Sequence, residues 1–256
     1  MLSFGSMNTM ISGSGSDVLF LHGGGVSGWM WKPVINQLAG TVRTIVPDLP
    51  GHGTSNSVDY VSHADTVSRL AELIRDRTPR GAIVAGFSLG GQLAIALASW
   101  HPELVRGALI VSAETKPAPA QAATLSLLRR TAPLAKQEWF AKLQAKQLGV
   151  PGAYLAQYVR DSQALSVETM LASVGENIAF TLPTDWRSFS RPVTVVVGSK
   201  ERKLMHDSAK LTHEALPHSD LVLAEDAAHD APFTRPKLLA EQIRTLVTAT
   251  GPRYAR

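Results

Sequence analysis

The chain has 256 residues, of which 45% are hydrophobic and 18% are charged, and its formal net charge is +4 at pH 7. This composition is typical of a globular domain and excludes a disordered or collagen-like chain. The basic residues are scattered and no run of about 18 apolar residues occurs, so we expect neither a nucleic-acid partner nor a membrane span.

The chain contains no cysteine, which excludes disulfides and thiolate metal sites. No histidine spacing of the HExxH type is present, and we expect no metal site. Residues 1–10 lack the basic and apolar regions of a signal peptide, so a cytoplasmic protein is expected.

Strand and helix patterns alternate along most of the chain, starting with short strands before residue 17 that a turn interrupts. The clearest helix follows Ser62, which resembles a capping box with Asp65, and its apolar residues recur at i, i+3, i+4 and i+7 from Val67. This alternation predicts a mostly parallel sheet with helices on both faces. Further strands are predicted at residues 17–22, 41–47, 81–87, 105–113, 192–199 and 220–226, and helices at 31–40, 62–76, 89–100, 206–216 and 236–250.

Residues 114–185 break this alternation. They show only helical or irregular patterns, interrupted by Pro117, Pro119 and Pro133. A segment of this length is too long for a loop. We therefore predict a core of residues 1–113 and 186–256, with an inserted helical segment at 114–185 that we call the cap.

A serine lies between a predicted strand and a predicted helix in the segment GFSLG, residues 86–90. A sharp strand-to-helix turn strains the backbone of its central residue, here Ser88, and lifts that side chain clear of the sheet. Gly86 and Gly90 are small enough to avoid clashes on either side. The following helix N-terminus offers free N–H groups that suit a developing oxyanion. The turn thus indicates a nucleophile, and an N-capping serine in an ordinary turn is the alternative.

Four motifs in order extend this interpretation over nearly the whole chain. They are LHGGG at residues 21–25, DLPGHGTS at 48–55, GFSLGG at 86–91 and AAHDAPFTRP at 227–236. Through them the chain resembles the α/β-hydrolase fold family, in the capped branch that holds esterases and carbon–carbon hydrolases. The resemblance implies a mostly parallel central sheet with helices on both faces and an inserted helical cap.

The resemblance also implies a base and an acid for Ser88. His229 follows the last predicted strand and precedes the last predicted helix, where the family's catalytic histidine lies. The family's acid follows the strand after the cap, commonly as an aspartate, and Glu201 stands at that position here. Because glutamate is longer by one methylene, Glu114 and Asp226 remain open as alternative acids.

The remaining histidines fall into two groups. His22 and His52 belong to glycine-containing loops, and we expect both to fix loop geometry. Surface roles are expected for the others, which lie in or beside predicted helices: His63, His101, His206, His213 and His218.

A tetrahedral intermediate of acyl transfer needs two N–H donors. The amide of Leu89, directly after Ser88, is expected to be one. The resemblance implies that the glycine loop supplies the other, at Gly24, and Gly25 is the alternative because a triple glycine allows either register.

Together these residues predict a serine hydrolase that cleaves carboxylic esters of small to medium substrates through an acyl-enzyme, without a cofactor. Cleavage of a carbon–carbon, lactone or amide bond by the same residues is an alternative, as is a non-catalytic binding protein on this scaffold. The cap is expected to roof the site, with substrate contacting Trp29, Phe87 and Trp139. Further pocket candidates are Met30, Phe140, Tyr154, Tyr158 and Phe180. The sequence indicates no oligomeric state.

Overall fold

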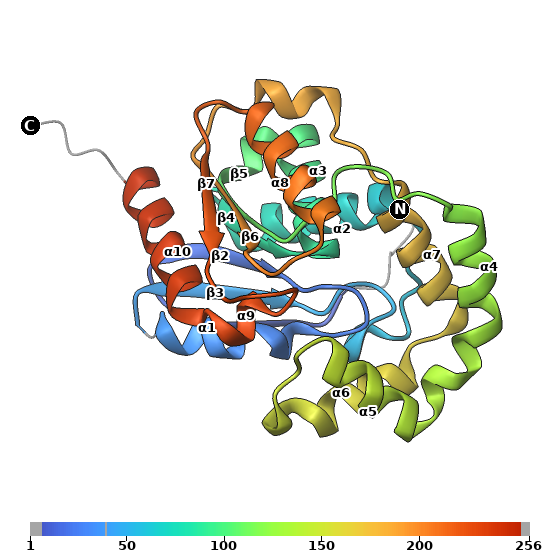
Figure 1. Ribbon diagram of the computed structural model, residues 1–256. Coiled ribbons are helices and arrows are strands. Elements are labelled where there is room, and N and C mark those ends of the chain that lie inside the picture. Colours follow the sequence, from blue (N-terminus) through green and yellow to red (C-terminus); the bar gives the residue numbers. More distant parts are fainter. Residues whose placement is uncertain (1–6, 39, 252–256) are drawn as a thin grey trace, which may run out of the picture.

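A seven-stranded sheet forms the centre of the molecule (Figure 1). The structure is a computed structural model, and it describes residues 7–38 and 40–251. The strand order is β1-β3-β2-β4-β5-β6-β7, and only β1 is antiparallel to its neighbour within these residues. The predicted mostly parallel sheet is confirmed. The strands are β1 Thr9–Gly13, β2 Ser16–Leu21, β3 Val42–Pro47, β4 Ala82–Phe87, β5 Val105–Val111, β6 Val193–Gly198 and β7 Asp220–Ala224.

Two expectations fall partly on residues 1–6, which lie outside the described residues. These are the absence of a signal peptide and the beginning of the first short strands. Within the described residues, no helix is long and apolar enough to cross a membrane.

Side chains of the sheet alternate between two apolar cores. In β2, Leu19 and Leu21 face one core while Val18 and Phe20 face the other, and all four are fully buried. Because successive side chains of a strand point to opposite faces, a strand covered on both faces is apolar at every position. Helices α2, α3 and α8 pack on the first core, and α1 and α10 pack on the second (Figure 1).

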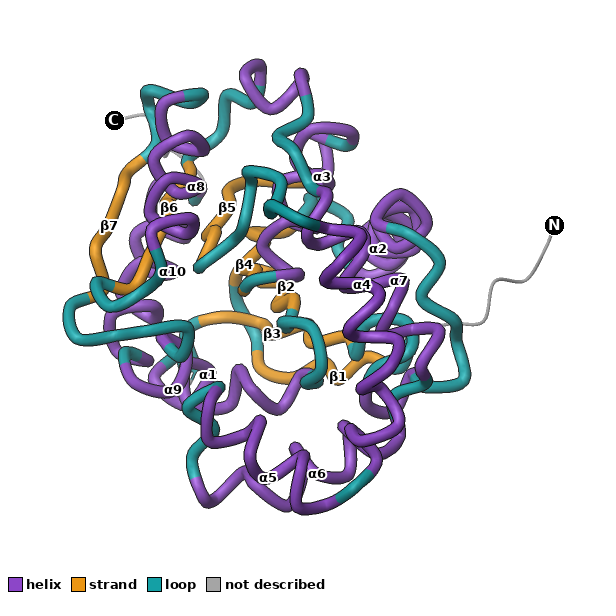
Figure 2. The backbone as a smooth tube through the Cα atoms, turned by 45° about the vertical axis from the view of Figure 1, so that its right-hand side comes forward, coloured by secondary structure: helices purple, strands orange, loops and turns teal. Residues whose placement is uncertain are grey.

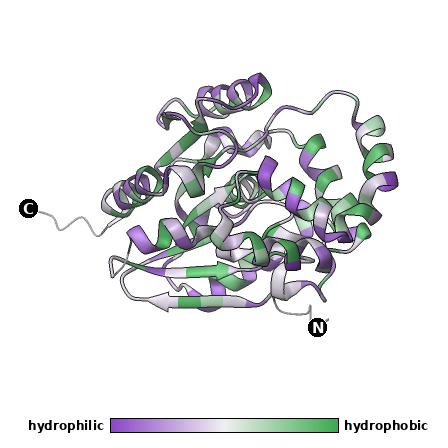
Figure 3. Cartoon of the chain, turned by 60° about the horizontal axis from the view of Figure 1, so that its bottom comes forward, coloured by the Kyte–Doolittle hydropathy of each residue, from purple (hydrophilic) through white to green (hydrophobic). Residues whose placement is uncertain are grey.

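The helices that cover the sheet are amphipathic, and Figure 3 shows hydrophobic and hydrophilic residues on the same helices. In α2 the Ser62 hydroxyl accepts a hydrogen bond from the Asp65 amide at 3.1 Å, which confirms the predicted N-terminus. The core helices are α1 Lys32–Gln37, α2 His63–Arg77, α3 Leu89–Trp100, α8 Lys203–Glu214, α9 Ala231–Thr234 and α10 Pro236–Thr250.

Four further helices lie between β5 and β6, in the segment predicted as the cap. Figure 2 shows α4 beside α7 and α5 beside α6, and the contacts between elements give the same two pairs. The division of the chain into a core and a cap stays a prediction. These helices are α4 Gln121–Thr131, α5 Glu138–Gln147, α6 Leu155–Ala164 and α7 Val167–Ala179.

Candidate active site

The candidate site lies at the carboxyl edge of the sheet. Ser88 directly follows β4, Glu201 comes soon after β6, and His229 comes soon after β7. Parallel strands end at the same edge, so residues far apart in sequence meet there.

The turn after β4 holds Ser88 in a strained conformation, with φ 52° and ψ −115°. A Cβ added to Gly86 would lie 2.1 Å from the carbonyl oxygen of Gly90, and one added to Gly90 would lie 2.2 Å from that of Leu21. Only glycine fits at these two positions, because backbone atoms occupy the space that a side chain would need. The turn therefore presents Ser88 at the edge of the sheet.

Ser88, His229 and Glu201 form a chain of hydrogen bonds. The Ser88 Oγ lies 3.1 Å from His229 Nε2, and His229 Nδ1 lies 3.1 Å from Glu201 Oε2. Since a carboxylate only accepts, Nδ1 carries the ring proton and Nε2 is free to accept from the serine. The side chain of Glu201 is 1% exposed, and its other oxygen accepts a hydrogen bond from Ser112.

The two alternative acids lie elsewhere. Glu114 is buried, and its Oε1 has no hydrogen-bond partner among the described residues. Burial raises the pKa of the Glu114 carboxyl, while the charges of Arg202 and His229 oppose this shift. Asp226 is exposed and pairs with Lys200 at 3.0 Å. The structure thus brings Glu201, rather than Glu114 or Asp226, to the imidazole.

The glycine loop after β2 lies across from the start of α3. The Gly23 amide donates a hydrogen bond to the Met30 sulfur at 3.3 Å. The amides of Gly24, Gly25 and Leu89 make no hydrogen bond within the described part of the chain. A Cβ on Gly24 would lie 3.8 Å from Leu89 Cδ2, and both residues line the same pocket.

A pocket of about 320 Å³ opens beside Ser88 and His229. Its floor includes Gly24 and Leu89, and its walls come from α4 to α7 and the segments between them. Within the part of the chain that the structure describes, no Lys, Arg, Asp or Glu side chain lines it. The wall residues are Leu128, Ala135, Gln144, Leu148, Tyr158, Ser162, Leu165, Met170, Ser173, Val174 and Asn177.

The three predicted substrate contacts do not line this pocket. Trp29 is 3% exposed and stacks on Tyr154, with ring centroids 5.4 Å apart. Phe87 is buried against the His229 ring at 4.8 Å. Trp139 is 61% exposed on the outer side of α5. Of the further candidates, Tyr158 lines the pocket and the other four do not, because packing and exposure decide which side chains face a cavity.

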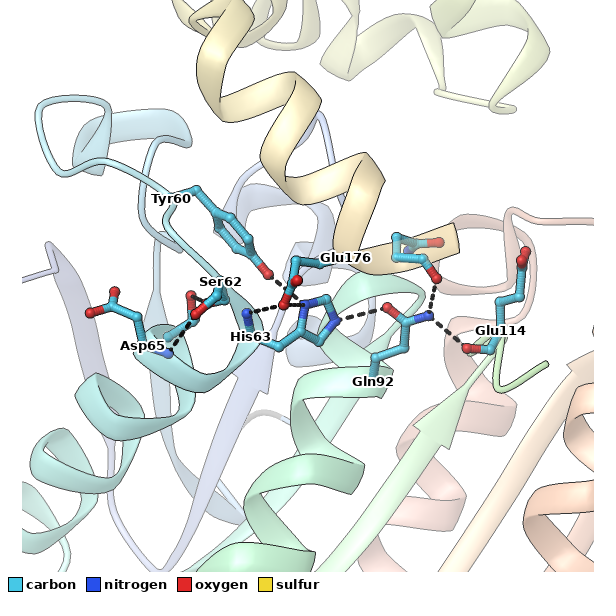
Figure 4. A network of polar contacts seen from close by, with 9 residues as sticks. Tyr60, Ser62, His63, Asp65, Gln92, Glu114 and Glu176 are labelled. Atoms are coloured by element: carbon cyan, nitrogen blue, oxygen red, sulfur yellow. Dashed lines mark hydrogen bonds and ion pairs between the residues drawn. The ribbon is translucent and has the colours of Figure 1, made fainter. Parts of the chain in front are cut away.

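The expected surface role of His63 is wrong, because its side chain is buried in a polar network (Figure 4). The amide of Gln92 donates to the carbonyl oxygens of Glu114 and Asn177, at 2.6 and 3.0 Å. The Gln92 oxygen is therefore free to accept from His63 Nε2 at 3.0 Å, and Nδ1 accepts from the Tyr60 hydroxyl at 3.0 Å.

This network joins α2 and α3 to α7, since the Glu176 carboxylate accepts from the His63 backbone amide at 2.7 Å. Burial lowers the pKa of His63, and Gln92 and Glu176 oppose the shift. A neutral ring fits the two hydrogen bonds that it makes.

His22 and His52 are fully or almost fully buried and hold backbone in place, as expected from the sequence. His22 Nε2 accepts from the Leu49 amide at 2.8 Å, so its Nδ1 donates to the Gly23 carbonyl oxygen at 2.8 Å. Burial lowers the pKa of His22, and it lowers the pKa of His52 to about 3.

Sequence reasoning missed two residues that contact this region. Ser112 donates to Glu201. Ser112 directly follows β5, and Glu201 comes soon after β6, which pairs with β5. A polar residue at the end of a neighbouring parallel strand is a signal that could have pointed to it. Asp161 of α6 binds the loop after β2, and no pattern in the sequence indicates that contact.

A mostly parallel sheet with a strained serine after a central strand and a histidine after the last strand defines the α/β-hydrolase class. A model of the alpha/beta hydrolase family matches residues 18–242, and the chain belongs to that family.

Curated relatives cover most of the chain. It is 28% identical to the pimeloyl-[acyl-carrier protein] methyl ester esterase of Nitrosomonas europaea over 243 residues, which are 89% of this chain and 94% of the relative. It is 30% identical to the protein of the same name from Yersinia pseudotuberculosis over 236 residues, which are 85% of this chain and 87% of the relative.

Solved structures share the fold. A thermophilic esterase from Thermogutta terrifontis is similar with a TM-score of 0.79 at 22% identity, covering 95% of this chain and 93% of the other. The enol-lactonase from Burkholderia xenovorans is similar with a TM-score of 0.81 at 17% identity, covering 94% and 96%. At these identities the likeness concerns the fold alone.

Proposed function

We propose that the protein is a serine hydrolase that cleaves carboxylic esters of small to medium size through an acyl-enzyme on Ser88. The observation that carries this proposal is the chain of two 3.1 Å contacts from Ser88 through His229 to Glu201, beside a pocket of about 320 Å³. Membership of the alpha/beta hydrolase family and relatives named as methyl ester esterases support the ester bond as its target.

In the first half of the reaction, Ser88 Oγ attacks the ester carbonyl carbon while its proton passes to His229 Nε2. Glu201 holds Nδ1–H and stabilises the imidazolium that forms. The amides of Gly24 and Leu89 donate to the oxyanion. When the tetrahedral intermediate collapses, His229 returns the proton to the leaving alkoxide and the acyl group stays on Ser88.

In the second half, water gives a proton to His229 and attacks the acyl carbon. The second intermediate collapses to release the carboxylic acid, and the proton returns to Ser88. Every proton is transferred by groups of this chain or by water, so the mechanism requires no cofactor. The cytoplasmic location stays a prediction from the sequence.

The pocket suggests the kind of acyl group. Its volume of about 320 Å³ lies at the small end of the range for small-molecule sites. Six of its eleven wall residues are apolar, and no Lys or Arg side chain of the described residues lines it. A free carboxylate on the acyl chain would lose its hydration without gaining a cationic partner among the described residues, so neutral chains are favoured.

The test is kcat/KM over a series of neutral aryl esters with lengthening acyl chains. We expect turnover to rise until the chain fills the pocket and then to fall. The matched Ser88→Ala variant should lose about 10⁶-fold in kcat. Turnover that is unchanged in Ser88→Ala would overturn the proposal.

A matched pair of substrates tests the neutral pocket. An aryl ester whose acyl chain ends in a methyl ester should be hydrolysed faster than the same chain ending in a free carboxylate. Equal rates, or a preference for the carboxylate, would mean that the acyl chain occupies a different surface.

A further inference from the structure

One carboxylate connects the cap to the loop that follows β2. Asp161 lies in α6, and its Oδ2 accepts from the Ser27 hydroxyl at 2.7 Å and from the Trp29 Nε1–H at 2.7 Å. Both donors are 3% exposed. Hydrogen bonds of this length to a charged acceptor belong to the strong class. Without Asp161, two buried donors would lose their acceptor.

The same loop carries the proposed oxyanion donor, Gly24. Core residues hold it at two places: the His22 ring donates to the Gly23 carbonyl oxygen at 2.8 Å, and Asp48 Oδ1 accepts from the Gly28 amide at 2.8 Å. Asp161 adds an anchor from the cap. The loop therefore depends on both parts of the chain for its conformation.

The Trp29 side chain, which donates to Asp161, also contacts the segment that follows His229. Its ring contacts Tyr154, the N-cap residue of α6, and Phe233 of α9, with centroids 5.4 and 6.0 Å away, and these two rings also contact each other at 6.0 Å. Phe233 lies four residues after His229 in the sequence. A displacement of α6 would thus be transmitted through this cluster of three rings to Trp29 and α9.

Helix α6 also forms part of the pocket wall. Tyr158 and Ser162 of this helix line the pocket, as does its C-cap residue Leu165, whereas Asp161 contacts the loop. Helix α6 therefore has two roles. Some of its side chains line the pocket, and Asp161 binds the loop that carries Gly24.

We propose that Asp161 is a positioning residue, which holds the Gly24 amide in place for the oxyanion when α6 covers the pocket. This inference rests on the proposed function, because it assigns Gly24 to the transition state of ester hydrolysis. On this proposal, the cap both covers the pocket and fixes the position of an oxyanion donor. A loop displaced by a fraction of an ångström weakens transition-state stabilisation more than substrate binding.

The experiment compares Asp161→Ala and Asp161→Asn with the wild type on the best neutral aryl ester. We expect Asp161→Ala to lower kcat by about tenfold or more while KM changes by less than about threefold. Asp161→Asn should recover most of the kcat, because its amide oxygen can accept from both Ser27 and Trp29. Glu168→Ala, which removes an exposed carboxylate from α7, is the matched control and should behave as wild type.

A double-mutant cycle identifies the partner. Ser27→Ala and Asp161→Ala should each lower kcat, and the double variant should lose less than the product of the two losses, because both remove the same contact. Hydrogen exchange of the peptide that spans residues 22–31, followed by mass spectrometry, should be faster in Asp161→Ala than in Glu168→Ala. If Asp161→Ala does not fold, Ser27→Ala, which removes one donor to the same carboxylate, should lower kcat and speed the exchange of this peptide, and an unchanged Ser27→Ala would overturn the positioning role.

The outcomes separate this inference from the proposed function. Wild-type kcat and unchanged exchange in Asp161→Ala, with Ser88-dependent turnover intact, would overturn the positioning role alone. Independent, multiplicative losses in the cycle would also overturn it. Turnover that does not depend on Ser88 would instead reject the proposed function.

Discussion

Two buried carboxylates lie near His229, and their surroundings distinguish them. Glu201 accepts from the imidazole at 3.1 Å and from Ser112. One buried oxygen of Glu114 has no partner among residues 7–38 and 40–251, and burial raises the pKa of this carboxyl. A triad acid must hold the imidazole by a hydrogen bond, so the contacts favour Glu201 for this role.

Glutamine at each position tests this choice. Glu201→Gln should lower kcat by about 10³- to 10⁴-fold, because an amide no longer fixes the Nδ1–H tautomer or stabilises the imidazolium. Glu114→Gln makes the same chemical change beside the site and should leave kcat unchanged. Steady-state hydrolysis of one aryl ester measures both variants, and equal, mild losses would show that neither residue holds His229.

At the scale of elements, the turn between β4 and α3 depends on close backbone contact. A Cβ on Gly90 would lie 2.2 Å from the carbonyl oxygen of Leu21 and 2.7 Å from that of His22. Neither oxygen is at the end of a flexible side chain, so α3 or β2 would have to move. The position of Ser88 depends on both elements.

Gly90→Ala is therefore expected to lower the free energy of unfolding by about 1–3 kcal/mol. It should also lower kcat, because α3 carries the Leu89 amide. Gly152→Ala is the matched control, since a Cβ there meets no atom within 4 Å. Urea denaturation gives the free energies, and a Gly90→Ala variant as stable as Gly152→Ala would contradict the close packing of this turn.

For the whole molecule, buried neutral histidines make stability depend on pH. Burial lowers the pKa of His22 and His63, and it lowers the pKa of His52 from 6.5 to about 3. Nearby carboxylates, Asp48 and Glu176 among them, oppose these shifts without cancelling them. Below pH 6.5 the unfolded chain binds protons that the folded chain does not, so the free energy of unfolding falls as pH decreases.

His52 alone should account for a loss of about 2 kcal/mol between pH 7 and pH 5. In His52→Asn this part of the pH dependence should disappear. His218→Asn replaces an exposed histidine and should keep the full dependence. Urea denaturation at both pH values measures the difference, and an unchanged dependence in His52→Asn would show that the ring is not held neutral by the fold.

The sequence predicted the order of strands and helices along the chain because apolar periodicity and glycine positions mark these elements locally. Apolar runs such as that of β4, and the glycines beside Ser88, have direct local causes. No local sequence pattern determines which residues contact one another across the cap. The burial of His63 depends on Gln92 and Glu176, and the pocket wall depends on how four helices pack, which local periodicity does not specify.

The central claim is that Ser88 is the nucleophile of an ester hydrolase. Intact mass spectrometry after treatment with a serine-directed phosphonate tests it most directly. We predict one adduct on the native protein, mapped to the peptide that contains Ser88, and none on Ser88→Ala. Native protein without an adduct, or an adduct that persists in Ser88→Ala, would contradict the claim.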